Sequence, residues 1–75
     1  TFIIVKVMTA PDIGLFIRDK RSSLQITQQR LCEITGISVH ALSNIESGKA
    51  NPTVDVLSRL CDALGLELVV RVRGA

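Results

Sequence analysis

Residues 27–48 read TQQRLCEITGISVHALSNIESG, a pattern of two short helices that meet at a fixed corner. Gly36 supplies the turn between the two helices. Thr27 and Ser38 stand just before them, where a side-chain oxygen can accept a hydrogen bond from a free backbone N–H group. The sequence therefore predicts a helix-turn-helix, with helices over about 28–35 and 39–47.

Each predicted helix has one apolar face. We expect the first helix to bury Leu31, Cys32 and Ile34, and the second to bury Leu42 and Ile45. The outward face of the second helix then carries small or hydrogen-bonding side chains, namely Ser38, Val39, His40, Ser43 and Asn44. A DNA major groove presents hydrogen-bond donors, acceptors and thymine methyl groups rather than charge. This nearly neutral face therefore predicts contact with base edges, although Val39 is equally well explained by packing against the preceding helix.

A further helix is expected upstream, over about 11–22. Thr9 and Asp12 resemble a capping box, and Ile13, Phe16 and Ile17 would face the core. A bend follows near Gln25, where a positive φ would cost about 1 kcal/mol relative to glycine.

Positive charges gather beside the predicted reading helix. They are Arg18, Lys20, Arg21 and Arg30, with Asp19 as the one acid among them. Such a local excess would favour DNA phosphates, and a solvated helix surface explains any single one of these residues equally well. The net charge of +2 is too small to establish nucleic-acid binding by itself.

Downstream of Gly48, a loop leads into a fourth helix. Lys49 and Asn51 of this loop either donate to a phosphate or serve only the turn. Thr53 is a suitable N-cap and Gly65 a suitable stop for the helix between them. Its apolar stripe consists of Val54, Leu57, Leu60, Cys61 and Leu64.

Both ends of the chain have the composition of strands. Residues 66–73, LELVVRVR, alternate so that Leu66, Leu68, Val70 and Val72 share one face, and residues 1–8 are rich in β-branched side chains. Because lone strands leave unpaired backbone groups, we expect a small sheet shared across the two-fold axis of a homodimer. The dimer would hold two reading helices about 34 Å apart, on a pseudo-palindromic operator.

Length and composition limit the alternatives. A chain of 75 residues makes one domain, here mainly α, with strands at 1–8 and 66–73 around a helical core at 9–65. Cys32 and Cys61 fall at apolar helix positions, which favours buried thiols in a cytoplasmic protein over a disulfide or metal site. No cofactor, small-molecule substrate or membrane segment is expected. His40 and Ser43 have no orienting acid nearby, so an enzyme is not expected either.

Residues 21–64 resemble the Cro and CI repressor-like helix-turn-helix family, also called the Xre family. The resemblance rests on matches in order at several segments: Thr27-Gln28, Leu31, Gly36-Ile37-Ser38, Leu42-Ser43, Ile45-Glu46, Gly48, Pro52 and Ala63-Leu64. It implies a lambda-repressor-like four-helix fold, base contacts from the outward face described above, and a salt bridge between Arg21 and Glu46. It also implies that Gln28 bonds a phosphate or supports the reading helix. We assign phosphate contacts to Gln28, Thr27, Lys49, Asn51 and Arg18.

The ending Leu64-Gly65-Leu66-Glu67-Leu68 resembles the narrower group of HipB-like antitoxins. That resemblance implies strand pairing across a dimer, repression of the protein's own operon and binding of a HipA-type kinase toxin. Two alternatives remain open: a free-standing phage or chromosomal Xre-type repressor, and a protein–protein adaptor built on the same fold.

Overall fold

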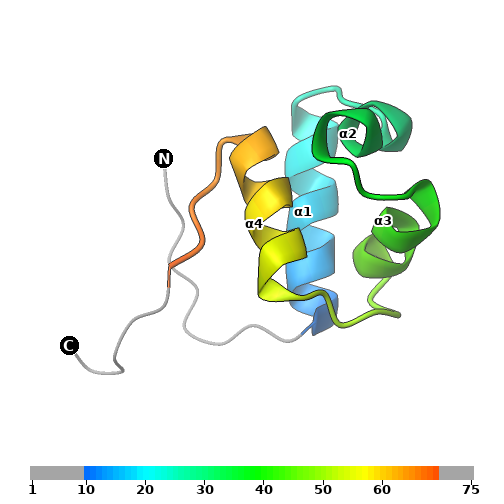
Figure 1. Cartoon of the computed structure of the whole chain (residues 1–75), viewed down its shortest axis with the longest axis vertical. Coiled ribbons are helices and arrows are strands. Elements are labelled where there is room, and N and C mark those ends of the chain that lie inside the picture. Colours follow the sequence, from blue (N-terminus) through cyan, green and yellow to red (C-terminus); the bar gives the residue numbers. More distant parts are fainter. Residues whose placement is uncertain (1–9, 70–75) are drawn as a thin grey trace.

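The computed structural model describes residues 10–69, which form four helices. They are α1 (Ala10–Ser23), α2 (Gln28–Thr35), α3 (Val39–Glu46) and α4 (Val54–Leu64). Figure 1 shows α1 between α4 on one side and α3 on the other. The helix α2 packs against α3 and α4. The prediction of four helices is confirmed, and the expected bounds differ from the observed ones by one residue at most.

Three helices begin at the predicted N-caps. The side-chain oxygens of Thr27, Ser38 and Thr53 accept hydrogen bonds from the backbone N–H groups of Arg30, Ala41 and Val56, at 3.0, 3.1 and 3.2 Å. Such a cap is typically worth about 1 kcal/mol. At the other end of α2, Gly36 has φ +76° and donates its N–H to the carbonyl of Cys32 at 2.8 Å. A residue with a Cβ rarely adopts this conformation, which explains a glycine at the corner.

The core receives one fully buried aliphatic side chain from each helix. These residues are Ile17 from α1, Leu31 from α2, Leu42 from α3 and Leu60 from α4. Partly buried neighbours, including Ile13 and Ile26, pack around them. All four helices therefore share one core, and displacing any of them would expose apolar surface from the others.

Two residues expected in the core are exposed. Ile34 has 51% of its surface accessible and Val54 has 70%. Successive helical residues turn by about 100°, so Ile34 lies about 60° around α2 from the buried Leu31 and about 160° from the buried Cys32, at the edge of the buried face. Val54 is the first residue of α4 and lies beyond the end of the stripe formed by Leu57, Leu60 and Leu64. The predicted apolar faces were too wide at these two positions.

The bend before α2 is located at Gln25. This residue has φ +58° and is the one non-glycine residue with positive φ in the described part of the chain. The N–H groups of Leu24, Gln25 and Ile26 all bond carbonyls of the last turn of α1, at 3.2, 2.9 and 3.2 Å. These bonds satisfy the end of α1 and offset the cost of the left-handed residue.

The predicted C-terminal strand is wrong for residues 66–69, which have no regular secondary structure. Leu66 donates its N–H to the carbonyl of Cys61 at 2.8 Å and packs on the core. It therefore completes the stop of α4 and is not free to begin a sheet ladder, which in any case needs a second strand. The rest of this strand, with Val70 and Val72, and the strand expected at 1–8 lie outside the described residues.

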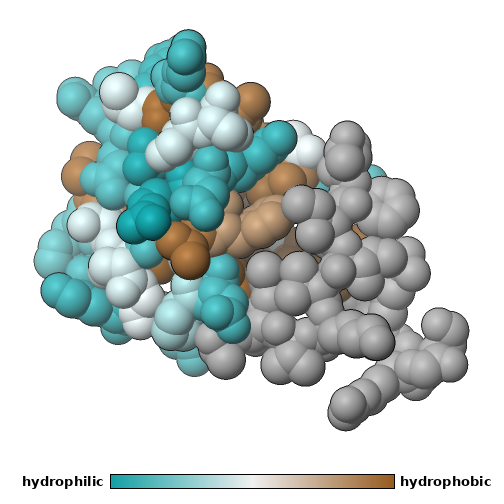
Figure 2. Space-filling view, turned by 180° about the vertical axis from the view of Figure 1, so that it is seen from behind, coloured by the Kyte–Doolittle hydropathy of each residue, from teal (hydrophilic) through white to brown (hydrophobic). Residues whose placement is uncertain are grey.

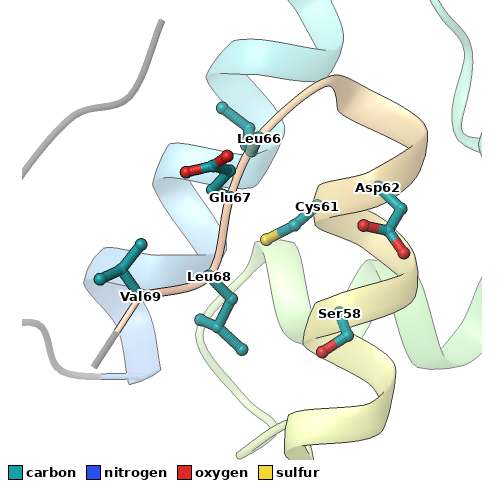
Figure 3. A pocket seen from close by; sticks show the side chains of 7 residues that line it. All are labelled: Ser58, Cys61, Asp62, Leu66, Glu67, Leu68 and Val69. Carbon is teal, nitrogen blue, oxygen red and sulfur yellow. The ribbon is translucent and has the colours of Figure 1, made fainter.

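Residues 66–69 line an open pocket of about 370 Å³ together with α4. Figure 3 shows the sulfur of Cys61 pointing from α4 toward this segment, and Leu68 pointing back toward the side of Ser58. Leu68 and Val69 remain 45% and 52% exposed. Elsewhere, hydrophilic residues cover most of the described surface on the face in Figure 2, with a few hydrophobic residues near its middle. No helix within residues 10–69 has the length and apolar character needed to cross a membrane.

Candidate nucleic-acid interface

The helix α3 is fixed to the core by one face and leaves the other accessible. Leu42, Ile45 and Glu46 are 0%, 3% and 5% exposed. Of the predicted base-reading residues, Ser38, Val39, His40 and Ser43 are exposed and Asn44 is half-buried. The structure therefore places all five on or beside one accessible face of a helix that is held from behind.

The carboxylate of Glu46 holds three elements together beneath this face. Arg21 of α1 donates from Nε to Glu46 Oε2 at 2.7 Å and from Nη2 to Oε1 at 2.9 Å. Gln28 of α2 donates from Nε2 to the same Oε1 at 3.0 Å. Arg21 also donates from Nη1 to the carbonyl of Ile26 at 2.8 Å, which reaches the link between α1 and α2. The network thereby fixes α3 relative to α1 and α2.

The expected salt bridge between Arg21 and Glu46 is present, and both side chains are largely shielded from solvent. The two side chains are 14% and 3% exposed. The hydrogen bond to Glu46 raises the pKa of Arg21, although desolvation acts in the opposite direction. Because its charge is paired with the buried carboxylate of Glu46, Arg21 contributes little to the positive patch that the sequence suggested.

Gln28 supports α3. The resemblance left two roles for Gln28, a phosphate contact or support of α3. The structure shows the second role, because the amide nitrogen of Gln28 donates to Glu46. One amide N–H remains for another partner.

The other predicted phosphate contacts lie on three different elements. Lys49 and Asn51 are exposed in the loop after α3, whose backbone N–H groups at Lys49 and Ala50 bond the carbonyl of Asn44 at 2.9 and 3.2 Å. Thr27 is occupied as the cap of α2. Arg18 lies on α1 with Asp19 at 3.8 Å. Within the described part of the chain, no hydrogen bond or ion pair joins these four side chains.

A contact inside α3 joins two of the predicted base-reading residues. Asn44 Nδ2 and His40 Nε2 are 3.2 Å apart, and the residues are one helical turn from each other. The amide nitrogen of asparagine can only donate, so this contact requires His40 Nε2 as the acceptor, in the tautomer with the ring proton on Nδ1.

Gly14 also positions α3, a role that the helical pattern of the sequence does not indicate. A Cβ atom at Gly14 would overlap the carbonyl oxygen of Ile45, so the backbones of α1 and α3 are in direct contact. A glycine inside a helix costs about 1 kcal/mol relative to alanine, which is itself a signal of close packing.

The two cysteines are free and buried. Burial raises the pKa of the Cys32 thiol, and the charge of Glu46 acts in the same direction. Burial also raises the pKa of the Cys61 thiol. In the described part of the chain, no three His, Cys, Asp or Glu side chains come together in a way that would hold a metal ion.

Comparison with known proteins identifies the same part of the chain. The profile of a family described as Helix-turn-helix matches residues 17–70. An uncharacterized HTH-type transcriptional regulator of Mycobacterium tuberculosis, found in strains H37Rv and CDC 1551, is 42% identical over 51 residues, which is 68% of this chain and 36% of the relative. The ImmF control region 10 kDa protein of Bacillus phage phi105 is 34% identical over 58 residues, 77% of this chain and 64% of the phage protein.

The chain thus spans about a third of the length of the mycobacterial relatives. The matched residues 17–70 include the whole of α2, α3 and α4 and the network around Glu46. The chain therefore belongs to the helix-turn-helix family of the Xre type, the group of the Cro and CI repressors.

Proposed function

We propose that this protein is a transcriptional regulator that binds double-stranded DNA and reads a sequence with α3. The observation that carries the proposal is the division of α3 into a buried and an accessible face. Leu42, Ile45 and Glu46 hold the helix in place, and the opposite face has neutral side chains suited to base edges. The names of the mycobacterial and phage relatives, which refer to transcriptional regulation and to a control region, support this proposal.

We assign the two kinds of DNA contact to different residues. Base contacts come from Ser38, Val39, His40, Ser43 and Asn44, and phosphate contacts from the exposed Lys49 and Asn51 with Arg18 and Thr27 at the edges. Gln28 has a mixed role, since its amide already supports Glu46. Phosphate contacts set affinity and register, whereas base contacts select the sequence.

A salt titration with the protein and fluorescent duplex DNA tests the proposal. If the protein binds DNA, log K falls linearly as log salt rises, because phosphate contacts release counterions. Negligible DNA affinity at low salt, with no dependence on salt concentration, would support the protein–protein adaptor instead. Selection from a randomised duplex pool then shows whether binding depends on sequence.

The DNA-binding form is proposed to be a homodimer whose contact lies at the C-terminal segment. Leu68 and Val69 expose apolar surface there, directly after Leu66 has packed on the core. Deletion of residues 68–75 retains Leu66 and the stop of α4, so the helical core should stay folded by circular dichroism. Analytical ultracentrifugation should then detect monomers with weaker operator binding, and a dimeric truncated protein would contradict this contact.

An antitoxin role is the finer proposal, and it rests on the HipB-like ending alone. The absence of a strand over residues 66–69 removes part of that resemblance. The phage relative favours the second candidate, a free-standing repressor. Co-expression with the product of the adjacent gene separates these two roles. Purification of a stable complex with a HipA-type kinase would support the antitoxin, and separate elution would support the repressor.

A further inference from the structure

The accessible face of α3 contains one side chain able to recognise a single base through two hydrogen bonds. Val39 offers only methyl groups, and Ser38 and Ser43 each offer one hydroxyl, of which that of Ser38 already accepts from Ala41. Asn44 has a carboxamide, with a donor and an acceptor side by side. Sequence discrimination by two-point contact is therefore concentrated at Asn44.

The contact with His40 determines which part of this carboxamide stays available. A carboxamide nitrogen carries one N–H on the side of Cβ and one on the side of the carbonyl oxygen. His40 precedes Asn44 by one turn of the same helix, at 3.2 Å from the amide nitrogen. When His40 takes the N–H on the Cβ side, Oδ1 and the N–H beside it remain together as an acceptor and donor pair.

We infer that Asn44 recognises an adenine, and that His40 is the residue that positions its amide. In the major groove, adenine presents the N7 acceptor next to the N6 donor, which matches an N–H and Oδ1 taken together. Guanine presents two acceptors and would leave Oδ1 facing a lone pair. Cytosine and thymine each offer a single polar group to this edge. The inference rests on the proposed function and adds to it the base that is read.

The role of His40 follows from the direction of the hydrogen bond. With the ring proton of His40 on Nδ1, Nε2 accepts from Asn44, and a carboxamide rotated by 180° would place Oδ1 against the Nε2 lone pair. In this tautomer, His40 favours one of the two amide orientations before DNA arrives. This pre-organisation reduces the ordering cost of the contact.

Selection from a randomised duplex pool tests this inference, with the wild-type protein and Asn44→Ala. The wild type should enrich sequences with adenine at one position of each half-site. Asn44→Ala should lose that preference by about 5- to 150-fold, the range for a two-point base contact, while preferences elsewhere remain. The matched control is Gln29→Ala, because Gln29 is an exposed carboxamide side chain on α2 with no assigned DNA contact. This control should retain the preference for adenine at the same position.

Two substitutions of His40 test whether its hydrogen-bond acceptor, and not merely its size, positions the amide of Asn44. His40→Gln keeps an acceptor and should retain most of the adenine preference, whereas His40→Leu removes the acceptor and should weaken the preference at the same position. Thermal unfolding by circular dichroism should be the same for both, since His40 is exposed. Equal adenine preference in the two variants would overturn the positioning role.

The outcomes distinguish the inference from the proposed function. If the wild type enriches a defined sequence and Asn44→Ala enriches the same one, the inference is wrong and the proposed function stands. If the wild type enriches no sequence and binds no DNA at low salt, the proposed function fails and the inference fails with it.

Discussion

Gly14 shows how one residue determines the distance between two helices. The contact of its backbone with the carbonyl of Ile45 allows α1 and α3 to approach more closely than side chains permit. This effect differs from the left-handed conformation of Gly36, because Gly14 lies within α1 and is needed for space rather than for φ. Gly14 was not recognised in the sequence, because the helical pattern records which residues face the core but not how near the backbones come.

We predict that Gly14→Ala destabilises the protein although alanine is the better helix former. The added Cβ forces α1 and α3 apart, and overpacking of this kind typically costs about 1–3 kcal/mol. Urea denaturation measures the change in the free energy of unfolding. Ser22→Ala, at an exposed position of the same helix, is the control and should change it by no more than about 0.5 kcal/mol. A Gly14→Ala variant as stable as the wild type would contradict the close approach.

The buried thiols predict a loss of stability in alkali. Burial raises the pKa of Cys32 and of Cys61, so the folded protein keeps these protons to a higher pH than the unfolded chain. The free energy of unfolding should therefore fall as the pH rises above about 8.5, where the unfolded thiols begin to ionise. Urea midpoints measured from pH 7 to pH 10 give the slope. The Cys32→Ala, Cys61→Ala double variant should show a flatter decline, and an identical slope would contradict the prediction.

At the scale of elements, the helices could be predicted because their end signals are local. Thr27, Ser38 and Thr53 each cap a helix through contacts within three residues, and Gly36 and Gly65 end two of them. Exposure of Ile34 depends on where the neighbouring helices lie, which no local pattern records. The absence of a strand over residues 66–69 has a similar cause, since strand pairing depends on a partner strand.

The network around Glu46 predicts strong coupling between α1 and α3. Arg21→Met leaves Glu46 buried with only Gln28 as a side-chain donor, and Glu46→Leu leaves Arg21 without its main partner. Loss of one partner of a buried pair typically costs about 3–5 kcal/mol. The double variant should cost clearly less than the sum of the single variants in chemical denaturation. Additive costs would show that the two side chains act independently. Arg30→Gln, in the exposed pair with Glu33, is the control and should have little effect.

Ser38 is expected to affect both stability and DNA binding, whereas Thr53 should affect stability alone. Both cap a helix through the same type of hydrogen bond. Ser38→Ala and Thr53→Ala should each lower the free energy of unfolding by about 1 kcal/mol. Only Ser38→Ala should also weaken operator binding in fluorescence anisotropy, because α3 carries the proposed base contacts. Equal DNA affinity of the two variants would remove Ser38 from the interface.

For the whole molecule, the charges available to DNA are fewer than the sequence suggested. Arg21 is used by Glu46, and Arg30 and Arg59 pair with Glu33 and Asp55 at 3.2 and 3.0 Å. Lys49 is exposed beside the end of α3 and forms no ion pair with another described residue. The sequence therefore indicated which residues of α3 are accessible, but could not show which cations were already paired.

Lys49→Gln should weaken binding to all DNA sequences alike. Removal of one phosphate contact lowers the slope of log K against log salt by about 1, without changing base preference. Fluorescence anisotropy at several salt concentrations measures the slope. Arg59→Gln, on α4 and away from the proposed contacts, provides the matched control with an unchanged slope. A change of base preference in Lys49→Gln would mean that Lys49 reads sequence directly.

The separation of the anchoring residues of α3 from its accessible residues has a consequence for how such a protein can diversify. Val39, His40 and Ser43 are exposed and lie outside the core, so these three positions can be recoded without repacking the interior. Ser38 is less free because its hydroxyl also caps α3, and Asn44 is less free because it is half-buried. New operator preferences should therefore arise first at 39, 40 and 43, within a scaffold whose folding remains unchanged.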